Sequence, residues 1–409
     1  GFLIYQIEIT GTPIILGCTD PTAYNYDSLA TYNDGSCYDY QEVELFQGWS
    51  LISTYIVPFE NVLDSIFATV VYDIRLCKDE NGSVYWPIFN IDAIGPLQIG
   101  KAYLINMQTN HTIGIKGNQV QPELQELTLP AGWSMLGYLR TTPALVDILL
   151  SPVVYELAIV KDHFGMVYWP QFGLNIIGNM LPGRGYQISM YSTQSYFYPA
   201  NDTLLKSTPV LNYNQTNNGI NTGNNMTLGL KFNSCFDNKM VSVYNQSGIE
   251  IGNGAVHGNF AAISLWGNDE LTTFTDGLLP GEEFEIRIEN EIIFIDNWEQ
   301  GNGWYTKDGI SLAKNIDMPL QSNVFKVFPV QPNPFKNITH IRFYLPNKEK
   351  VLIEIFDISG KKVDEIYSDL LNSGNQSLPY VAKNLRAGTY YFRISTSQNT
   401  GTGKMQVLK

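Results

Sequence analysis

Apolar and polar side chains alternate over short stretches along most of this chain, as in "NNMTLGLKFNS" and "EEFEIRIENEIIFID". A period of two is typical of β-strands with one buried face. The stretches are separated by turns rich in Gly, Asn and Pro, and Lys/Glu-rich helical stretches are almost absent. The pattern therefore predicts a mainly β, multi-domain chain of small β-rich modules.

One pattern occurs twice, beginning at the Gly-Trp pairs of Gly48 and Gly132, which are 132 − 48 = 84 residues apart. In each copy a short helical spacing follows, near Pro58 or Pro143, and then a strand and a hairpin turn. The return strand carries Val-Tyr-Trp-Pro, and these blocks are offset by 167 − 84 = 83 residues. A repeat this regular predicts the same mostly β fold twice, with one short helix in each copy.

The rest of the chain reads as β structure without helices. An Asn/Thr/Gly-rich linker precedes a segment that predicts a β-sandwich, and from Val324 onward the strands predict a smaller antiparallel sandwich. The predicted domains are an N-terminal strand with a Cys-bracketed loop, repeat 1, repeat 2, the β-sandwich and the C-terminal domain, at residues 1–44, 45–125, 126–208, 209–321 and 322–409.

Charge separates the C-terminal domain from the rest of the 409 residues. Residues 1–324 carry 13 − 33 = −20, whereas residues 325–409 carry 12 − 6 = +6. The difference suggests two parts with different functions, and the acidic body argues against nucleic acid as a partner. The chain opens on "GFLIYQ", without Met, and we expect a mature form or a fragment whose upstream part is missing.

Cys18 and Cys37 bracket a turn-rich segment that would bring its two ends together. We predict a disulfide, worth about 3 kcal/mol in the chain-entropy model, and an oxidising compartment. The alternative is two unrelated free thiols. Cys77 and Cys235 lie in apolar, strand-like contexts, and we predict that each is a small buried apolar residue.

The C-terminal domain carries a series of short motifs in a fixed order. Pro332, Asn333 and Pro334 precede a strand, an Asp-x-x-Gly-Lys-x-Val hairpin follows, and a Leu-x-x-Gly-x-Tyr motif and a last strand close the chain. The residues of the later motifs are Asp357, Gly360, Lys361, Val363, Leu385, Gly388, Tyr390 and the terminal Lys409. This series resembles the type A C-terminal sorting domain of proteins exported by the type IX secretion system of Bacteroidota. One departure is "LPYVAKNL", where many members have a Trp-Asp pair.

The resemblance implies export of the preceding domains across the outer membrane. It implies recognition of residues 322–409 by the type IX translocon and an outer-membrane β-barrel shuttle protein, and cleavage by a sortase with release or attachment to surface lipopolysaccharide. The expected location is the cell surface or the extracellular space, after periplasmic transit. The alternative is an ordinary C-terminal β-domain that stabilises its neighbour. The two repeats and the Cys-bracketed loop also resemble modules of secreted surface proteins from this phylum.

Candidate catalytic chemistry is sparse. The four His residues are scattered, and neither a Gly-x-Ser-x-Gly motif nor a phosphate-binding loop is present. We therefore expect no catalytic residues and no cofactor. Calcium at Asp20, Asp27 and Asp34 is an alternative to a stapled loop without metal. A group of acidic residues is predicted on one sandwich strand, as a solvated face: Glu282, Glu283, Glu285 and Glu289.

Aromatic side chains recur in register in the two repeats, as Tyr85 and Trp86 in the first and Tyr168 and Trp169 in the second. They could stack on sugar rings, but packing in each core is the favoured interpretation, as it is for Trp49 and Trp133. Asp-Ser/Thr-apolar triplets also mark three possible O-glycosylation sites, at Ser28, Ser65 and Thr203.

These observations favour a non-enzymatic, secreted or cell-surface protein that acts as an adhesin or binds polysaccharide. One alternative is the accessory region of a larger secreted hydrolase whose catalytic domain lies upstream. Another is a structural spacer.

Overall fold

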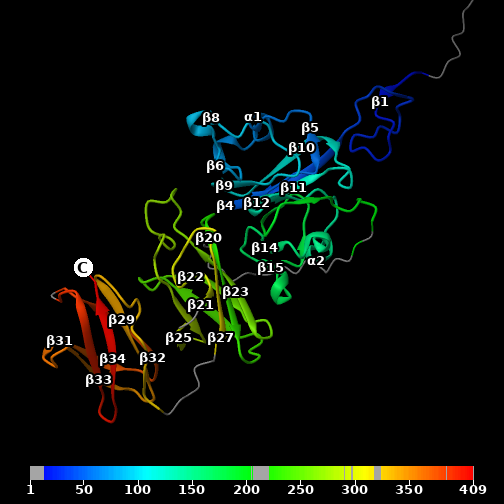
Figure 1. Cartoon of the computed structure of the whole chain (residues 1–409). Coiled ribbons are helices and arrows are strands. Elements are labelled where there is room, and N and C mark those ends of the chain that lie inside the picture. The colour runs from blue at the N-terminus through cyan, green and yellow to red at the C-terminus, as the bar shows by residue number, and fades with distance from the viewer. Residues whose placement is uncertain are drawn as a thin grey trace, which may run out of the picture. The chain divides into compact units, whose positions relative to one another are not determined.

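The computed structural model describes residues 13–203, 205, 221–289, 291–295, 298–316, 324–383 and 385–408 (Figure 1). Within these residues the chain forms 34 strands and two α-helices of four residues, which confirms a mainly β fold. No helix among them is long and apolar enough to cross a membrane. The chain divides into two compact units: residues 1–225 with 269–276, and residues 226–268 with 277–409. The predicted domain boundaries stay predictions.

Repeat 1 is built on a five-stranded antiparallel sheet in the order β4-β9-β6-β7-β8. These strands span Gly48–Ile52, Tyr103–Met107, Ile74–Lys78, Val84–Trp86 and Ile91–Asp92. A second sheet, β3-β10-β5, contains Asp39–Leu45, His111–Gln119 and Ile56–Pro58. Apolar side chains of the two sheets, including Val43, Ile105 and Ile113, meet in one core because each strand turns alternate residues inward.

Repeat 2 reproduces the large sheet as β12-β18-β14-β15-β16. Its strands span Gly132–Gly137, Gly185–Met190, Leu157–Lys161, Val167–Trp169 and Leu174–Asn175. The pairing agrees in detail, since Gly132 faces Met190 as Gly48 faces Met107. Two small pairs complete the repeat, β11-β19 and β13-β17, with strands Leu127–Leu129, Gln194–Tyr196, Ala144–Leu145 and Asn179–Met180.

The Gly-Trp pair has the same structural partner in both copies. The Lys78 Nζ lies 5.2 Å from the Trp49 ring centroid, and the Lys161 Nζ lies 4.4 Å from that of Trp133. A register shift occurs at the same place as well, between Ile74 and Leu76 and between Leu157 and Ile159. The sequence repeat is therefore a repeat of the fold.

Each repeat contains one short α-helix, as predicted, but it begins later than the prolines suggested. The helices are α1, at Leu63–Ile66, and α2, at Val146–Leu149. Pro58 instead ends strand β5, which pairs with β10. Four short 3-10 helices accompany them at Val71–Asp73, Pro87–Phe89, Ser151–Val153 and Pro170–Phe172. The first of these directly precedes β6, so the strand that follows α1 begins only at Ile74.

The residues of unit 2 before the C-terminal domain form a sandwich of two four-stranded sheets, β23-β20-β27-β26 and β22-β21-β24-β25. In the first sheet the strands are Phe260–Trp266, Asn225–Phe232, Ile310–Ile316 and Trp298–Gln300, and in the second Glu250–Ala255, Met240–Tyr244, Glu285–Ile288 and Glu291–Ile293. Strands β20 and β27 pair in parallel. Apolar residues from both sheets, such as Leu228 and Val243, form the core.

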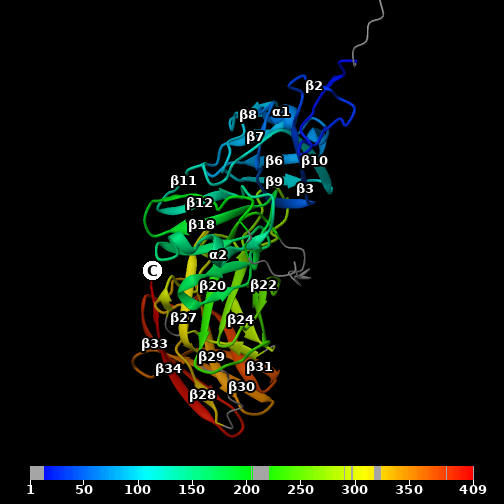
Figure 2. The same cartoon turned by 90° about the vertical axis from the view of Figure 1, so that its right-hand side faces the viewer.

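The C-terminal domain packs a three-stranded sheet, β28-β29-β32, against a four-stranded sheet, β31-β30-β33-β34. The strands span Lys326–Val327, Ile338–Leu345 and Gly374–Val381 in the first, and Lys362–Leu371, Glu349–Phe356, Gly388–Ser395 and Thr400–Val407 in the second. Strands β33 and β34 run side by side over eight residue pairs, and both views show them in red (Figure 1, Figure 2). The predicted small antiparallel sandwich is thus observed.

Candidate functional site: the C-terminal domain and an aromatic cavity

The Asp-x-x-Gly-Lys motif forms the turn between strands β30 and β31. The Asp357 carboxylate accepts hydrogen bonds from the Ser359 amide at 2.9 Å, the Ser359 hydroxyl at 2.6 Å and the Lys361 amide at 3.1 Å. These bonds, the Ser359 hydroxyl first, lower the pKa of Asp357. Gly360 adopts φ +81°, which a side chain would disfavour. Asp357 and Gly360 are therefore needed to form the turn. The side chains of Lys361 and Val363, the later residues of the motif, are exposed.

The Pro-Asn-Pro segment fastens the last strand, β34. The Asn333 side-chain oxygen accepts the Gln406 amide at 2.8 Å, and its nitrogen donates to the Lys404 carbonyl at 3.4 Å. The next apolar residue, Phe335, is buried, and its backbone exchanges hydrogen bonds with Gln406 and Leu408. This segment therefore holds β34 against the rest of the domain from the side opposite β33.

The Leu-x-x-Gly-x-Tyr motif closes the loop that leads into β33. Tyr390 is 9% exposed and contributes its ring to the core, while its hydroxyl donates to the Arg386 carbonyl at 2.9 Å. Leu385 packs against the same core, and Gly388 is the first residue of β33. The predicted motif residues thus stabilise the turns and edges of one sheet. Lys409 lies outside the described residues.

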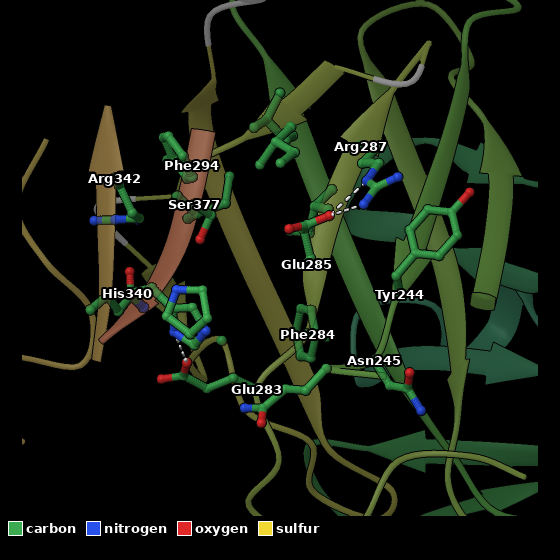
Figure 3. Close-up of a pocket in the computed structure, with 18 of the residues that line it drawn as sticks. Tyr244, Asn245, Glu283, Phe284, Glu285, Arg287, Phe294, His340, Arg342 and Ser377 are labelled. Atoms are coloured by element: carbon green, nitrogen blue, oxygen red, sulfur yellow. Dashed lines mark hydrogen bonds and ion pairs between the residues drawn. The ribbon is translucent and has the colours of Figure 1, made fainter. Parts of the chain in front are cut away.

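A cleft of about 460 Å³ lies between the sandwich and the C-terminal domain, within unit 2 (Figure 3). In the close-up, His340 of β29 faces Glu283, with 3.7 Å between Nδ1 and Oε2, and Glu285 pairs with Arg287 at 2.5 Å. The Arg342 guanidinium stacks 4.8 Å from the Phe294 ring centroid. The His340–Glu283 and Arg342–Phe294 contacts join the two domains, whereas the Glu285–Arg287 ion pair lies within strand β24 of the sandwich.

The acidic residues of this region do not share one strand, so that prediction is wrong. Strand β24 begins only at Glu285 and pairs antiparallel with β25. Glu289 lies in the intervening turn with φ +51°, and Glu283 precedes the strand and accepts a hydrogen bond from the Trp304 indole at 2.8 Å. Glu282 accepts the Leu279 amide in a turn. The alternation suggested one long strand, but the chain reverses direction within it.

A second cavity, of about 500 Å³, lies in unit 1 on the surface of repeat 1. Trp86 forms part of its wall and is half-buried, whereas Tyr72 is 92% exposed. The ring of Phe89, 61% exposed, stands edge-on to Trp86 with 4.7 Å between centroids. The remaining wall is formed by Val71, Ile74, Arg75, Pro87, Ile88, Gln108 and Leu271.

Most of the other aromatic candidates are buried, as the favoured interpretation predicts, whereas Trp133 is half-buried. Tyr85, Tyr168 and Trp169 are 1%, 6% and 3% exposed. The Tyr85 hydroxyl donates to Asp64 of α1 at 2.8 Å, and burial is the main reason that its pKa is raised. Trp49 is buried and its indole donates to Asp269 at 2.9 Å. Of the four proposed glycan contacts, Trp86 lines the cavity of repeat 1, and the other three are buried.

The N-terminal loop contains the predicted disulfide between Cys18 and Cys37. It is accompanied by a short parallel pair, β1 (Leu16–Gly17) with β2 (Tyr32–Asn33). Asp20, Asp27 and Asp34 each accept the amide two residues further on, at 2.8–2.9 Å. Among the described residues no group of three or more His, Cys, Asp or Glu side chains is arranged to hold a metal ion. Calcium binding here stays a prediction.

The remaining predicted positions can be placed as well. Cys77 is buried, as predicted, and burial raises its pKa. Cys235 is exposed, which corrects the prediction, because it lies in the turn after β20 instead of within a covered strand. The three possible glycosylation positions are all exposed: Ser28, Ser65 and Thr203.

Comparison with known families identifies the C-terminal domain. Residues 329–408 match the secretion system C-terminal sorting domain. The chain therefore carries the sorting domain of a type IX secretion substrate, and this domain directs export through the outer membrane to the cell surface or the extracellular space. It implies interaction with the type IX secretion machinery.

The chain also has remote similarity to several solved structures. No curated protein matches the chain. A β-glycosidase from Bacteroides vulgatus is 9% identical with a TM-score of 0.15, and the match covers 45% of this chain and 25% of that one. A biofilm-associated protein BSP domain is 11% identical at TM-score 0.16, covering 91% and 63%. A tetra-tandem repeat from the extending region of a large adhesion protein is 9% identical at TM-score 0.18, covering 87% and 93%. Scores this low carry no conclusion about fold or function.

Proposed function

We propose that the exported part of this chain is a non-catalytic surface protein that binds polysaccharide, and that the cavity at Trp86 is its ligand site. The observation that carries the proposal is the half-buried Trp86 in the wall of an open cavity, flanked by the exposed Tyr72. A cavity of about 500 Å³ suits a few sugar rings, given the usual range of ligand pockets of roughly 300–1,000 Å³.

The chemistry of the cavity supports a sugar ligand. The face of an indole ring carries partial negative charge, and the C–H face of a pyranose ring can stack on it. The cavity wall that contains Trp86 also contains Arg75 and Gln108, whose side chains can hydrogen-bond to sugar hydroxyls. The Gln108 side chain is held by a 3.0 Å hydrogen bond to the Tyr72 carbonyl, so this part of the wall is preorganised.

The partners of the sorting domain follow from its family. We also propose that the translocon and a β-barrel shuttle protein recognise the sorting domain, and that a sortase cleaves before it and attaches the exported part to surface lipopolysaccharide. Support comes from the exposed cations that flank the Asp357 turn, Lys361 and Lys362, on a domain of net charge 12 − 6 = +6.

The ligand site is tested by glycan-array binding of the full chain. We expect binding that the Trp86→Ala variant loses by at least tenfold. The matched control is Tyr155→Ala, because Tyr155 is 93% exposed and stands in repeat 2 where Tyr72 stands in repeat 1. Circular dichroism confirms that both variants fold.

An array without binding by the wild-type chain would contradict the proposal and favour a structural spacer. Binding that survives in Trp86→Ala would place the ligand elsewhere.

A further inference from the structure

The two repeats provide an internal comparison for the cavity, because equivalent strands differ in one charged residue. Strand β6 reads Ile-Arg-Leu-Cys-Lys, and the equivalent β14 reads Leu-Ala-Ile-Val-Lys. Arg75 therefore stands where repeat 2 has Ala158. Trp86 is half-buried, whereas its counterpart Trp169 is buried at 3% exposure. Repeat 1 thus combines a partly accessible indole with a cation, whereas repeat 2 has a buried indole and no cation at the matching positions.

Arg75 is exposed and forms part of the cavity wall. Within the described part of the chain, no carboxylate lies within ion-pair distance of its guanidinium, although nearby Asp73 has a partner in His111 at 2.9 Å. A guanidinium offers a planar pair of donors that matches the two oxygens of a carboxylate. An anionic group on the ligand would complete this arrangement.

We propose that the repeat-1 cavity is selective for an acidic saccharide, with a uronic acid ring stacked on Trp86 and its carboxylate paired with Arg75. This inference rests on the proposed function and names the ligand class of the same site. The chain as a whole is acidic, with a net charge of 25 − 39 = −14, so long-range electrostatic repulsion disfavours the approach of a polyanion. Selectivity must then come from the local contact with Arg75.

The test uses the full chain and uronic acid oligosaccharides of galacturonate, glucuronate and guluronate–mannuronate type. Each is compared with its methyl ester, which removes the charge and leaves the ring unchanged. We expect the wild type to bind at least one acid about tenfold more tightly than its ester, equivalent to about 1.4 kcal/mol. Arg75→Ala should bind both forms equally, at the level of the ester.

Two further variants distinguish this inference from the proposed function. Trp86→Ala should weaken both forms, whereas Lys116→Ala, which removes an exposed cation of β10 outside the cavity wall, should change neither. If the esters or neutral glycans bind as tightly as the acids and Arg75→Ala has no effect, the cavity still binds sugars but the acidic class is wrong. If the wild type binds no glycan at all, the proposed function itself fails.

Discussion

The role of the folded C-terminal sheet can be tested at Tyr390, because this side chain combines core packing with one hydrogen bond. Its ring is 9% exposed, and its hydroxyl donates to the Arg386 carbonyl at 2.9 Å. Tyr390→Phe removes the hydrogen bond at a cost of about 1 kcal/mol. Tyr390→Ala also removes a buried ring, at about 3–5 kcal/mol. A small domain is stable by roughly 5–15 kcal/mol, so the second loss is a large fraction of the total.

Hydrogen exchange on the full chain measures how much each of the two variants destabilises the C-terminal domain. We expect Tyr390→Ala to lose protection in β30, β33 and β34, and Tyr390→Phe to keep nearly all of it. Export to the medium, measured in a host with a type IX system, should follow the same order if the exporter reads the folded surface.

Two results would refute the reasoning. Tyr390→Phe that folds normally but stays in the periplasm would make the hydroxyl itself a recognition group. Tyr390→Ala that loses protection but is exported normally would show that the folded sheet is not what the exporter reads.

Three more outcomes are expected elsewhere in the chain. Cys18→Ser with Cys37→Ser should cost the N-terminal loop about 3 kcal/mol and speed its proteolysis, with no change in export. Arg140→Met should lower the free energy of unfolding by roughly 3 kcal/mol, because the buried guanidinium donates hydrogen bonds to the Pro199 carbonyl at 2.7 Å and to the Thr203 carbonyl at 3.0 Å. Burial lowers the pKa of His163 to about 3, so its contribution to stability is complete above about pH 6.5 and is lost as the pH falls toward 3. The urea stability of the wild type should therefore fall relative to that of His163→Phe across this window, and parallel curves would contradict the pKa.

Much of the fold was predictable because its elements have local causes. The Gly-Trp pairs and the Val-Tyr-Trp-Pro blocks located both repeats, and even the shared partner of each Trp, Lys78 or Lys161, lies in the repeated sequence. The Asp357 turn was predictable because an Asp and a Gly three residues later specify a tight hairpin. Periodicity could not locate the reversal at Glu289, since alternation continues on both sides of it.

The cavity at Trp86 was harder to predict from the sequence. The two repeats carry the same Tyr-Trp pair, at Tyr85 and Trp86 and at Tyr168 and Trp169. Only the extent of burial distinguishes Trp86 from the other three, and burial depends on tertiary packing. Arg75 was missed because a single exposed cation on a strand carries no pattern. The available signal was its replacement by Ala158 in the otherwise similar second copy.

The interface between the sandwich and the C-terminal domain, called the seam below, means that the proposed cleavage of this domain would also change the surface of the remaining chain. Phe294 has two partners across this seam, the Phe328 ring at 5.0 Å and the Arg342 guanidinium at 4.8 Å. A cut between residues 316 and 324 would remove both partners and release Glu283 from His340. The shortened molecule would then expose an aromatic and acidic patch that is half-buried in the full chain, so the proposed cleavage would create a surface as well as remove a signal.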